Sequence, residues 1–261
     1  MEFSVGDVLS RSALVLKRRG PQFFGVGLIV MLPVLALMFV LREHFDVQRD
    51  FQPPPPGGPD ATDRALDALL DLYTHMAIWN GSITLTEQLL TPILTAMVVF
   101  GSFRMLRGQD DRVRDAVDVV VRNLPRLIAV SIVYSLIVTI GTLLCCLPGI
   151  FAIIAMFVAV PAAVVERVGP VAAIRRSWTL VKPRFWPVVL VGLVLFAVIM
   201  GTGIVAGIFA QFAPTPVAIV VMWLARAVGL VFSSVASSVV YHDLRASSEG
   251  LLDEDYDAIF G

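Results

Sequence analysis

Residues 127–165 read LIAVSIVYSLIVTIGTLLCCLPGIFAIIAMFVAVPAAVV, and this stretch decides the fold. Its 39 residues include no charged side chain and would make about 58 Å of helix at about 1.5 Å per residue. The hydrocarbon core of a bilayer is about 30 Å thick, so a single straight crossing is excluded. Pro148 and Gly149 supply a turn, because proline cannot continue a helix and glycine tolerates reversed dihedral angles. The sequence therefore predicts a hairpin of two spans, 127–147 and 150–165.

Four further apolar runs bring the predicted number of membrane spans to six. They cover residues 23–41, 89–103, 188–209 and 217–240. The run 89–103 is short and reaches a usual span length by extending outward to Ile83, with Glu87 at the interface. Hydrophobic residues make up 57% of the chain and charged residues 16%. This composition predicts an all-α integral membrane protein, and it excludes a disordered chain, a nucleic-acid-binding module and a disulfide-stapled secreted domain.

The basic residues predict how the spans are oriented. With six crossings, 16 of the 20 Lys and Arg residues fall on the side of the N-terminus and three on the opposite side. Lys and Arg are enriched in cytoplasmic loops, so both termini of this multi-pass protein are expected to face the cytoplasm. The last basic residue, Arg226, lies inside the sixth predicted span.

The segments on the cytoplasmic side resemble one another. Apolar residues recur at helical spacing in 4–19, 110–124 and 170–181, and each segment leads into a span. The pattern predicts three hairpins, each preceded by an amphipathic interfacial helix, in repeat-like units 1–104, 105–165 and 166–245. These helices either brace the hairpins or recognise anionic lipid or a partner at the inner leaflet. The candidate contacts are Arg175, Arg176, Trp178, Lys182 and Arg184.

The extracytoplasmic loop, residues 42–88, is the only sizeable segment predicted outside the membrane on that side. Pro53–Pro56 predict a stiff spacer, and residues 60–79 predict a helix. Its apolar face is formed by Leu66, Leu69, Leu70, Tyr73, Met76 and Ala77, opposite Asp63, Asp67 and Asp71. That face suits either packing on the mouth of the bundle or docking a partner. At the other end of the chain, residues 251–261 predict an acidic cytoplasmic tail.

Arg226 is the one ionisable side chain deep in a predicted span. An arginine at mid-membrane costs about 2.5–3.5 kcal/mol on insertion scales and marks a candidate functional site. Glu87 is the nearest predicted counter-charge, and Thr91 and Thr95 lie on the same span as Glu87. The arginine either bonds backbone carbonyls as a structural residue or belongs, with Glu87, Thr91 and Thr95, to an intramembrane polar site.

No motif in the sequence predicts catalysis. We find no Gly-x-Ser-x-Gly elbow, no phosphate-binding glycine loop and no His-Glu-x-x-His, and the three histidines have no metal-ligand spacing. The sequence predicts neither an enzyme nor a bound cofactor or metal.

Residues 161–182, PAAVVERVGPVAAIRRSWTLVK, together with Tyr241–Arg245 and Ser4–Arg19, resemble the bacterial family named for the glycerophosphoryl diester phosphodiesterase membrane domain. The resemblance covers residues 1 to about 250 and implies a polytopic module of the bacterial cytoplasmic membrane. The catalytic part of such proteins is a separate barrel, which needs about 250 residues, so the resemblance carries over no catalytic residue. Glu166 and Arg167 end the fourth span, and Asp243 and Arg245 follow the sixth. We expect Glu166 or Asp243 to pair with Arg175, Arg176 or Arg245 and to lock the repeats together.

These observations favour a non-catalytic membrane module that organises a membrane partner or binds anionic lipid. The expected partners are membrane lipids and a further protein or a homo-oligomer, and not nucleic acid. The alternative is a small transporter or lipid-handling protein with a cavity near Arg226. A cavity lined by Arg226, Thr91 and Thr95 would favour this alternative, whereas a closed core with Arg226 on carbonyls would favour the module.

Overall fold

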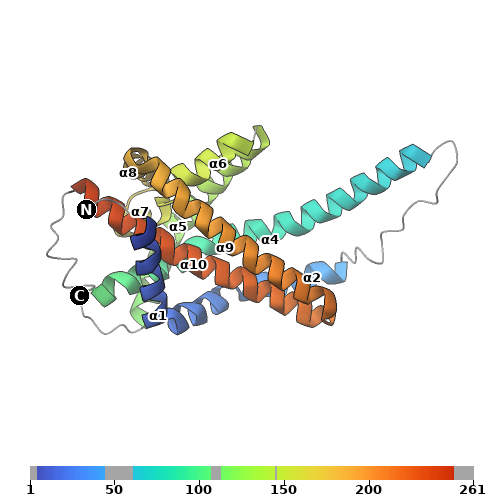
Figure 1. The fold of residues 1–261 in the computed structure, drawn as a ribbon, viewed down its shortest axis with the longest axis horizontal. Helices are drawn as coiled ribbons and strands as arrows, with labels where there is room; N and C mark the ends of the chain where they lie inside the picture. Colours follow the sequence, from blue (N-terminus) through green and yellow to red (C-terminus); the bar gives the residue numbers. More distant parts are fainter. Residues whose placement is uncertain (1–4, 45–60, 107–112, 145, 250–261) are drawn as a thin grey trace.

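The computed structural model describes residues 5–44, 61–106, 113–144 and 146–249. Of these described residues, 95% are helical and none forms a strand. The helices are α1 (Val5–Val30), α2 (Leu32–His44), α4 (Ala61–Leu106), α5 (Val113–Leu144), α6 (Cys146–Ala155), α7 (Ala159–Val165), α8 (Pro170–Val181), the short 3₁₀ helix η1 (Lys182–Arg184), α9 (Phe185–Phe212) and α10 (Thr215–Glu249) (Figure 1). The predicted proline-rich spacer and the acidic tail lie outside the described residues.

Five helical segments are long and apolar enough to cross a membrane, and a sixth is added if a bent pair counts as one span. The pair joins residues 20–30 of α1 to residues 32–43 of α2 at an angle of 41°. An all-α chain with five or six potential spans is compatible with a membrane protein, as the composition predicted.

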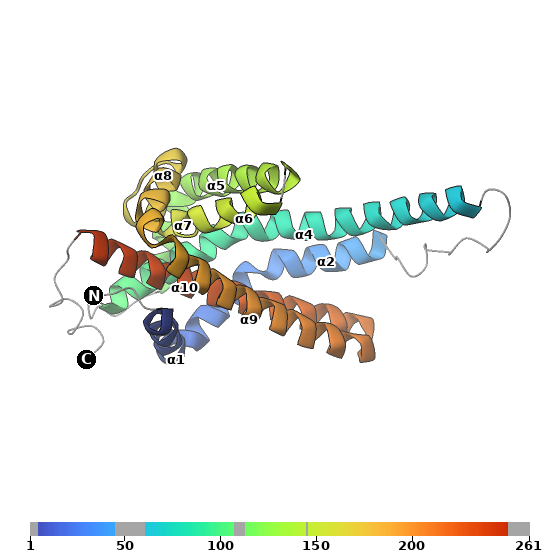
Figure 2. The same cartoon turned by 45° about the horizontal axis from the view of Figure 1, so that its top comes forward.

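Helix α10 lies at the centre of the bundle and packs against α9, α1 and α4. Helices α9 and α10 run side by side, and α2 lies along α4 (Figure 2). One buried apolar cluster joins α10 to α9 and α1 around Val188, Val240 and Val8. A second cluster joins α10 to α2 and α4 around Trp223, Met38 and Ile83. Side chains of α10 thereby connect the first helices of the chain with the last.

The α5–α6 hairpin corrects the predicted position of the turn. Helix α5 ends at Leu144 and α6 begins at Cys146, so Pro148 and Gly149 lie inside the first turn of α6, where proline is tolerated. Gly149 does not form the chain reversal between the two helices; it allows α6 to pack closely on α5. A Cβ atom added to it would lie 2.3 Å from Thr142 Oγ1 and 3.0 Å from the Thr142 backbone.

Two apolar runs predicted as continuous spans are broken helices. The first breaks at Met31, two residues before Pro33, and the fourth breaks at residues 156–158, before Pro161. Side chains from other helices bond carbonyls at both breaks. The Trp223 indole donates a hydrogen bond to the Met31 carbonyl at 2.8 Å, and the Ser177 hydroxyl donates to the Ala155 carbonyl at 2.8 Å.

Helix α4 joins two elements that the sequence analysis separated. The predicted outer helix and the second span are one helix of 46 residues, whose N-terminal half projects from the bundle (Figure 1, cyan). Its apolar face does not pack on the mouth of the bundle, since Tyr73 is 73% exposed and Leu69 is 60% exposed. Two of the three predicted cytoplasmic helices are likewise continuous with the apolar run that follows them. The first is part of α1 and the second is part of α5. The third, α8, forms a helix of its own.

Candidate functional site

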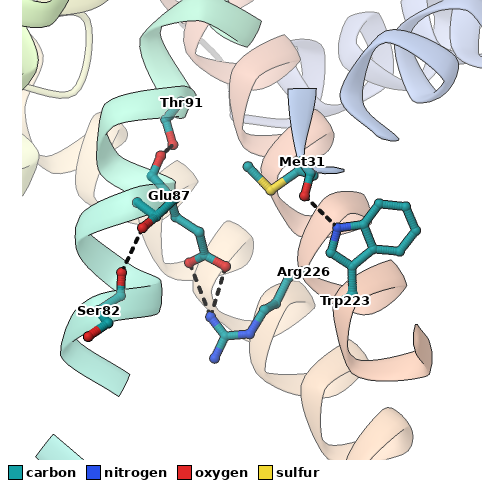
Figure 3. Close-up of polar contacts among 7 residues, drawn as sticks. Met31, Ser82, Glu87, Thr91, Trp223 and Arg226 are labelled. Atoms are coloured by element: carbon teal, nitrogen blue, oxygen red, sulfur yellow. Dashed lines mark hydrogen bonds and ion pairs between the residues drawn. The ribbon is translucent and has the colours of Figure 1, made fainter. Parts of the chain in front are cut away.

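Arg226, in the sixth predicted span, forms an ion pair between α10 and α4. Arg226 Nη1 lies 2.9 Å from Glu87 Oε1 and 3.1 Å from Glu87 Oε2 (Figure 3). The Glu87 side chain is 19% exposed and the Arg226 side chain is 31% exposed, so both charged side chains are largely covered by other protein atoms. The structure thus brings together Arg226 and Glu87, two of the four residues predicted to form an intramembrane polar site. The guanidinium binds this carboxylate, whereas one of the two expectations was that it would bind backbone carbonyls.

Trp223 lies one helical turn before Arg226 and holds α10 against the break between α1 and α2. Its indole N–H donates to the Met31 carbonyl (Figure 3). The same carbonyl also accepts hydrogen bonds from the backbone N–H groups of Val34 and Leu35. Two polar contacts on consecutive turns of α10 therefore tie it to α4 on one side and to the bent first span on the other.

Beside the ion pair, a cavity of about 260 Å³ lies between α4, α5, α10 and the broken α6–α7 pair. Thr91 and Thr95 line it, as the alternative function required, but Arg226 does not. Among the described residues that line this cavity, none is charged. Its polar lining consists of Gln88, Thr91, Thr95, Ser131, Tyr134, Ser233, Ser234 and Ser237. Its apolar lining consists of Pro92 and, from the α6–α7 side, Ile153, Met156, Phe157, Val160 and Pro161.

Most hydroxyl groups of the cavity wall already donate a hydrogen bond locally. Thr91 donates to the Glu87 carbonyl at 2.6 Å, and Ser131 donates to the Leu127 carbonyl at 2.8 Å. The Thr95 and Ser234 hydroxyls bond each other across the α4–α10 contact at 3.0 Å. A hydroxyl that donates once keeps lone pairs that can accept, so the Thr91 and Ser131 hydroxyls are left as acceptors for a bound molecule.

Gln88 is the exception in this wall. Its Oε1 is buried and has no hydrogen-bond partner among the described residues. Such an atom in a native structure calls for a partner, for instance a bound molecule. The prolines leave further acceptors. Pro92 has no N–H to offer the Gln88 backbone carbonyl, and Pro161 has none for the Phe157 carbonyl.

A second polar cluster lies at the end of the bundle that the charge pattern assigns to the cytoplasm. Arg176 Nε of α8 donates to Glu166 Oε1 at 2.7 Å, and the Tyr241 hydroxyl of α10 donates to the same oxygen at 3.0 Å. Asp243 Oδ1 accepts from Arg11 Nη1 of α1 at 3.1 Å. The expected pair Glu166–Arg176 is therefore present.

The other residues of that hypothesis lie in different environments. Asp243 bonds Arg11, a partner 232 residues away that sequence reasoning did not propose. Arg167 is exposed and has a positive φ of 55° just after α7. Arg245 is partly buried on the last turns of α10.

The five residues predicted to contact lipid or a partner at the inner leaflet differ in exposure and in their contacts. Arg175 and Lys182 are exposed, whereas Arg176 is engaged by Glu166 and so turns toward the bundle. Trp178 packs on Phe151 with ring centroids 5.3 Å apart, and Arg184 donates a hydrogen bond to the Ser247 hydroxyl. Contact of Arg175 and Lys182 with anionic lipid stays a prediction.

Sequence reasoning missed most of the cavity wall, namely Gln88, Ser131, Tyr134 and the α10 serines. The available signal was the run of Ser233, Ser234, Ser237 and Ser238 in an otherwise apolar helix. Its spacing places hydroxyls on one face of α10 over two turns.

Within the described residues, no three His, Cys, Asp or Glu side chains gather in a way that could hold a metal ion. Comparisons of the chain with family models, with curated proteins and with solved structures found no match. The resemblance to the phosphodiesterase membrane-domain family therefore stays a prediction.

Proposed function

We propose that this chain is a lipid-handling or small-molecule-binding membrane protein whose ligand occupies the hydroxyl-lined cavity. One observation carries the proposal, namely a cavity lined by uncharged residues, with hydroxyl groups on α4, α5 and α10 and hydrocarbon on the α6–α7 side. Hydroxyl groups from three helices line one space that protein atoms do not fill, and Gln88 Oε1 is buried there without a partner among the described residues. The break in α6–α7 beside the cavity supports this reading, because discontinuous helices flank the binding sites of many transporters.

The Glu87–Arg226 pair has a structural role in this proposal. The pair neutralises itself and lies outside the cavity lining, so it holds α4 against α10 and fixes one wall. The alternative function is thereby modified in one respect, because the ligand contacts Thr91 and Thr95 and not the arginine.

Native mass spectrometry of the full chain, released from lipid nanodiscs, tests the proposal. We expect the wild-type chain to retain one bound molecule and Ser233→Phe, which fills the cavity, to lose it. Ser248→Phe, at an exposed position on the same helix, is the matched control and should retain the molecule. A wild-type chain that emerges without any bound molecule would contradict the proposal.

The projecting half of α4 favours a second candidate function, assembly with a second copy. Exposed Leu66, Leu69, Tyr73 and Met76 follow the alternating three- and four-residue spacing of a coiled-coil seam. Two copies in one membrane share one orientation, so these seams would meet residue for residue in a twofold pair.

Cysteine cross-linking tests this pairing in a chain whose Cys145 and Cys146 are replaced by serine. Oxidation of a Tyr73→Cys variant should give a covalent dimer in the membrane. Asp71→Cys, on the opposite face of the same helix, should give little. Equal dimer yields from both variants would count against a defined seam.

A further inference from the structure

The chemistry of the cavity wall defines the class of ligand, an inference that rests on the proposed binding function. Within the described lining there is no charged side chain, and Glu87, which precedes the lining residue Gln88, is already paired with Arg226. A phosphate, carboxylate or ammonium group in the cavity would be buried without a counter-charge, at a cost of several kcal/mol. The wall therefore favours an uncharged ligand.

The hydrogen bonds already made in the wall favour a ligand that donates. Thr91 and Ser131 donate to carbonyls of their own helices, and Ser237 donates to the Ser234 carbonyl at 3.1 Å. Each of these hydroxyls keeps acceptor capacity, and Gln88 Oε1 is a buried acceptor without a partner. An uncharged group that donates hydrogen bonds is most simply an alcohol.

One side of the cavity lining is apolar, so the ligand should also carry hydrocarbon. Hydroxyl groups come from α4, α5 and α10, whereas Ile153, Phe157 and Val160 of the α6–α7 side present hydrocarbon. The volume of about 260 Å³ far exceeds the roughly 10–15 Å³ that one water molecule needs. It accommodates a polar head with the first carbons of a chain and leaves the rest of the lipid to the surrounding bilayer.

We propose that the cavity binds the hydroxyl-bearing head of a neutral glycerolipid, of which diacylglycerol is the simplest, with Gln88 Oε1 accepting from the lipid hydroxyl. The same alcohol chemistry exists in free polyols such as glycerol. The hydrocarbon wall favours the lipid, and the experiment separates the two sources.

Photo-labelling of the full chain in phosphatidylcholine nanodiscs tests this assignment. The probes are diacylglycerol and phosphatidic acid that carry the same diazirine-bearing acyl chain, so they differ only in the head. Trypsin releases residues 127–167 as one peptide, which contains α5 from Leu127 onward and the apolar wall of α6–α7. We expect diacylglycerol to label this peptide strongly and phosphatidic acid to label it several-fold less.

Variants assign the role of the acceptor. Gln88→Met preserves length and removes the acceptor, and it should lower diacylglycerol labelling roughly fivefold, as expected for one lost hydrogen bond. Gln211→Met, at an exposed position at the end of α9, should leave labelling unchanged. Because Gln88→Met could fail to fold, competition on the wild-type chain provides a second readout. Unlabelled diacylglycerol should displace the probe, and glycerol should not.

The outcomes separate this inference from the proposed function. Equal labelling by the neutral and the acidic probe would overturn the assignment of an uncharged head while leaving a lipid in the cavity. Displacement of the probe by glycerol would overturn the lipid as the source. Absence of labelling by both probes, together with a wild-type chain that carries no bound molecule in mass spectrometry, would overturn the proposed function itself.

Discussion

At the scale of single residues, the contact between Glu87 and Arg226 shows how an arginine can be placed inside an apolar helix. Nη1 of Arg226 contacts both carboxylate oxygens within 3.1 Å, which neutralises the charge. Such a pair need not add stability over an apolar pair, but removing one partner leaves an uncompensated charge.

We therefore expect Glu87→Gln to lower the free energy of unfolding by about 2–3 kcal/mol, toward the lower end for a buried pair because Arg226 is partly exposed. The double variant Glu87→Leu with Arg226→Met should recover most of the loss. Equilibrium unfolding in mixed detergent micelles measures both. A Glu87→Gln chain as stable as wild type would show that the pair contributes nothing.

The sequence predicted this pair and two residues of the cavity wall, Thr91 and Thr95, but not the rest of the wall, and the physical reason is specific. A lone arginine in a span demands a partner, and Glu87 was the nearest carboxylate. Serine and threonine do not need a partner on another helix, because their hydroxyls can donate to a carbonyl one turn back on their own helix. Ser131 donates in this way to the Leu127 carbonyl. Nothing in the sequence shows which of them face a common space.

At the scale of helices, the α5–α6 hairpin is held by close backbone contact. Gly149 packs on Thr142, and Gly141 packs on Gly149, with a Cβ at position 141 meeting Gly149 backbone atoms at 3.1 Å. Neighbouring backbone atoms cannot move aside as a flexible side chain can, so neither glycine has room for a larger residue.

Accordingly, Gly149→Ala should lower the free energy of unfolding by about 1–3 kcal/mol, the usual range for overpacking. Gly207→Ala on α9 is the control, because no atom lies within 4 Å of the added Cβ. It should be neutral or slightly stabilising, since alanine favours helix. Thermal unfolding followed by tryptophan fluorescence compares the two, and equal midpoints would refute the packing argument.

The positions at which helices begin and end were predicted less well than the helices themselves, because a single glycine or proline costs too little energy to end a helix by itself. The residues around Gly81 were read as a junction, yet glycine costs only about 1 kcal/mol within a helix, and α4 continues through it. Pro92 likewise stays inside α4, whereas Pro33 and Pro161 follow real breaks. The difference lies in tertiary contacts, since Trp223 and Ser177 bond the carbonyls at the two breaks. Such partners are invisible in the local sequence.

At the scale of the whole molecule, Arg11 and Asp243 link the first helix to the last. The two residues are 232 positions apart and their side chains are 21% and 12% exposed. The contact joins the first repeat-like unit to the third, a role that the sequence predicted for Asp243 but not with Arg11 as its partner.

Charge reversal checks this link. Asp243→Arg should lower the thermal midpoint by several degrees, because it places two like charges in contact. The swap Arg11→Asp with Asp243→Arg should restore most of the midpoint. Asp67→Arg, on the exposed outer part of α4, should leave it unchanged. A swap no more stable than the single reversal would argue against a direct pair.

The central claim is that the cavity between α4, α5, α10 and the α6–α7 break holds a ligand. A cryo-electron microscopy map of the chain in lipid nanodiscs, with a bound antibody fragment to add mass, tests it most directly. The account predicts elongated density inside the cavity, within hydrogen-bonding distance of Gln88 Oε1. A map in which the cavity is closed by its own side chains, with Gln88 bonded to a neighbouring residue, would contradict it.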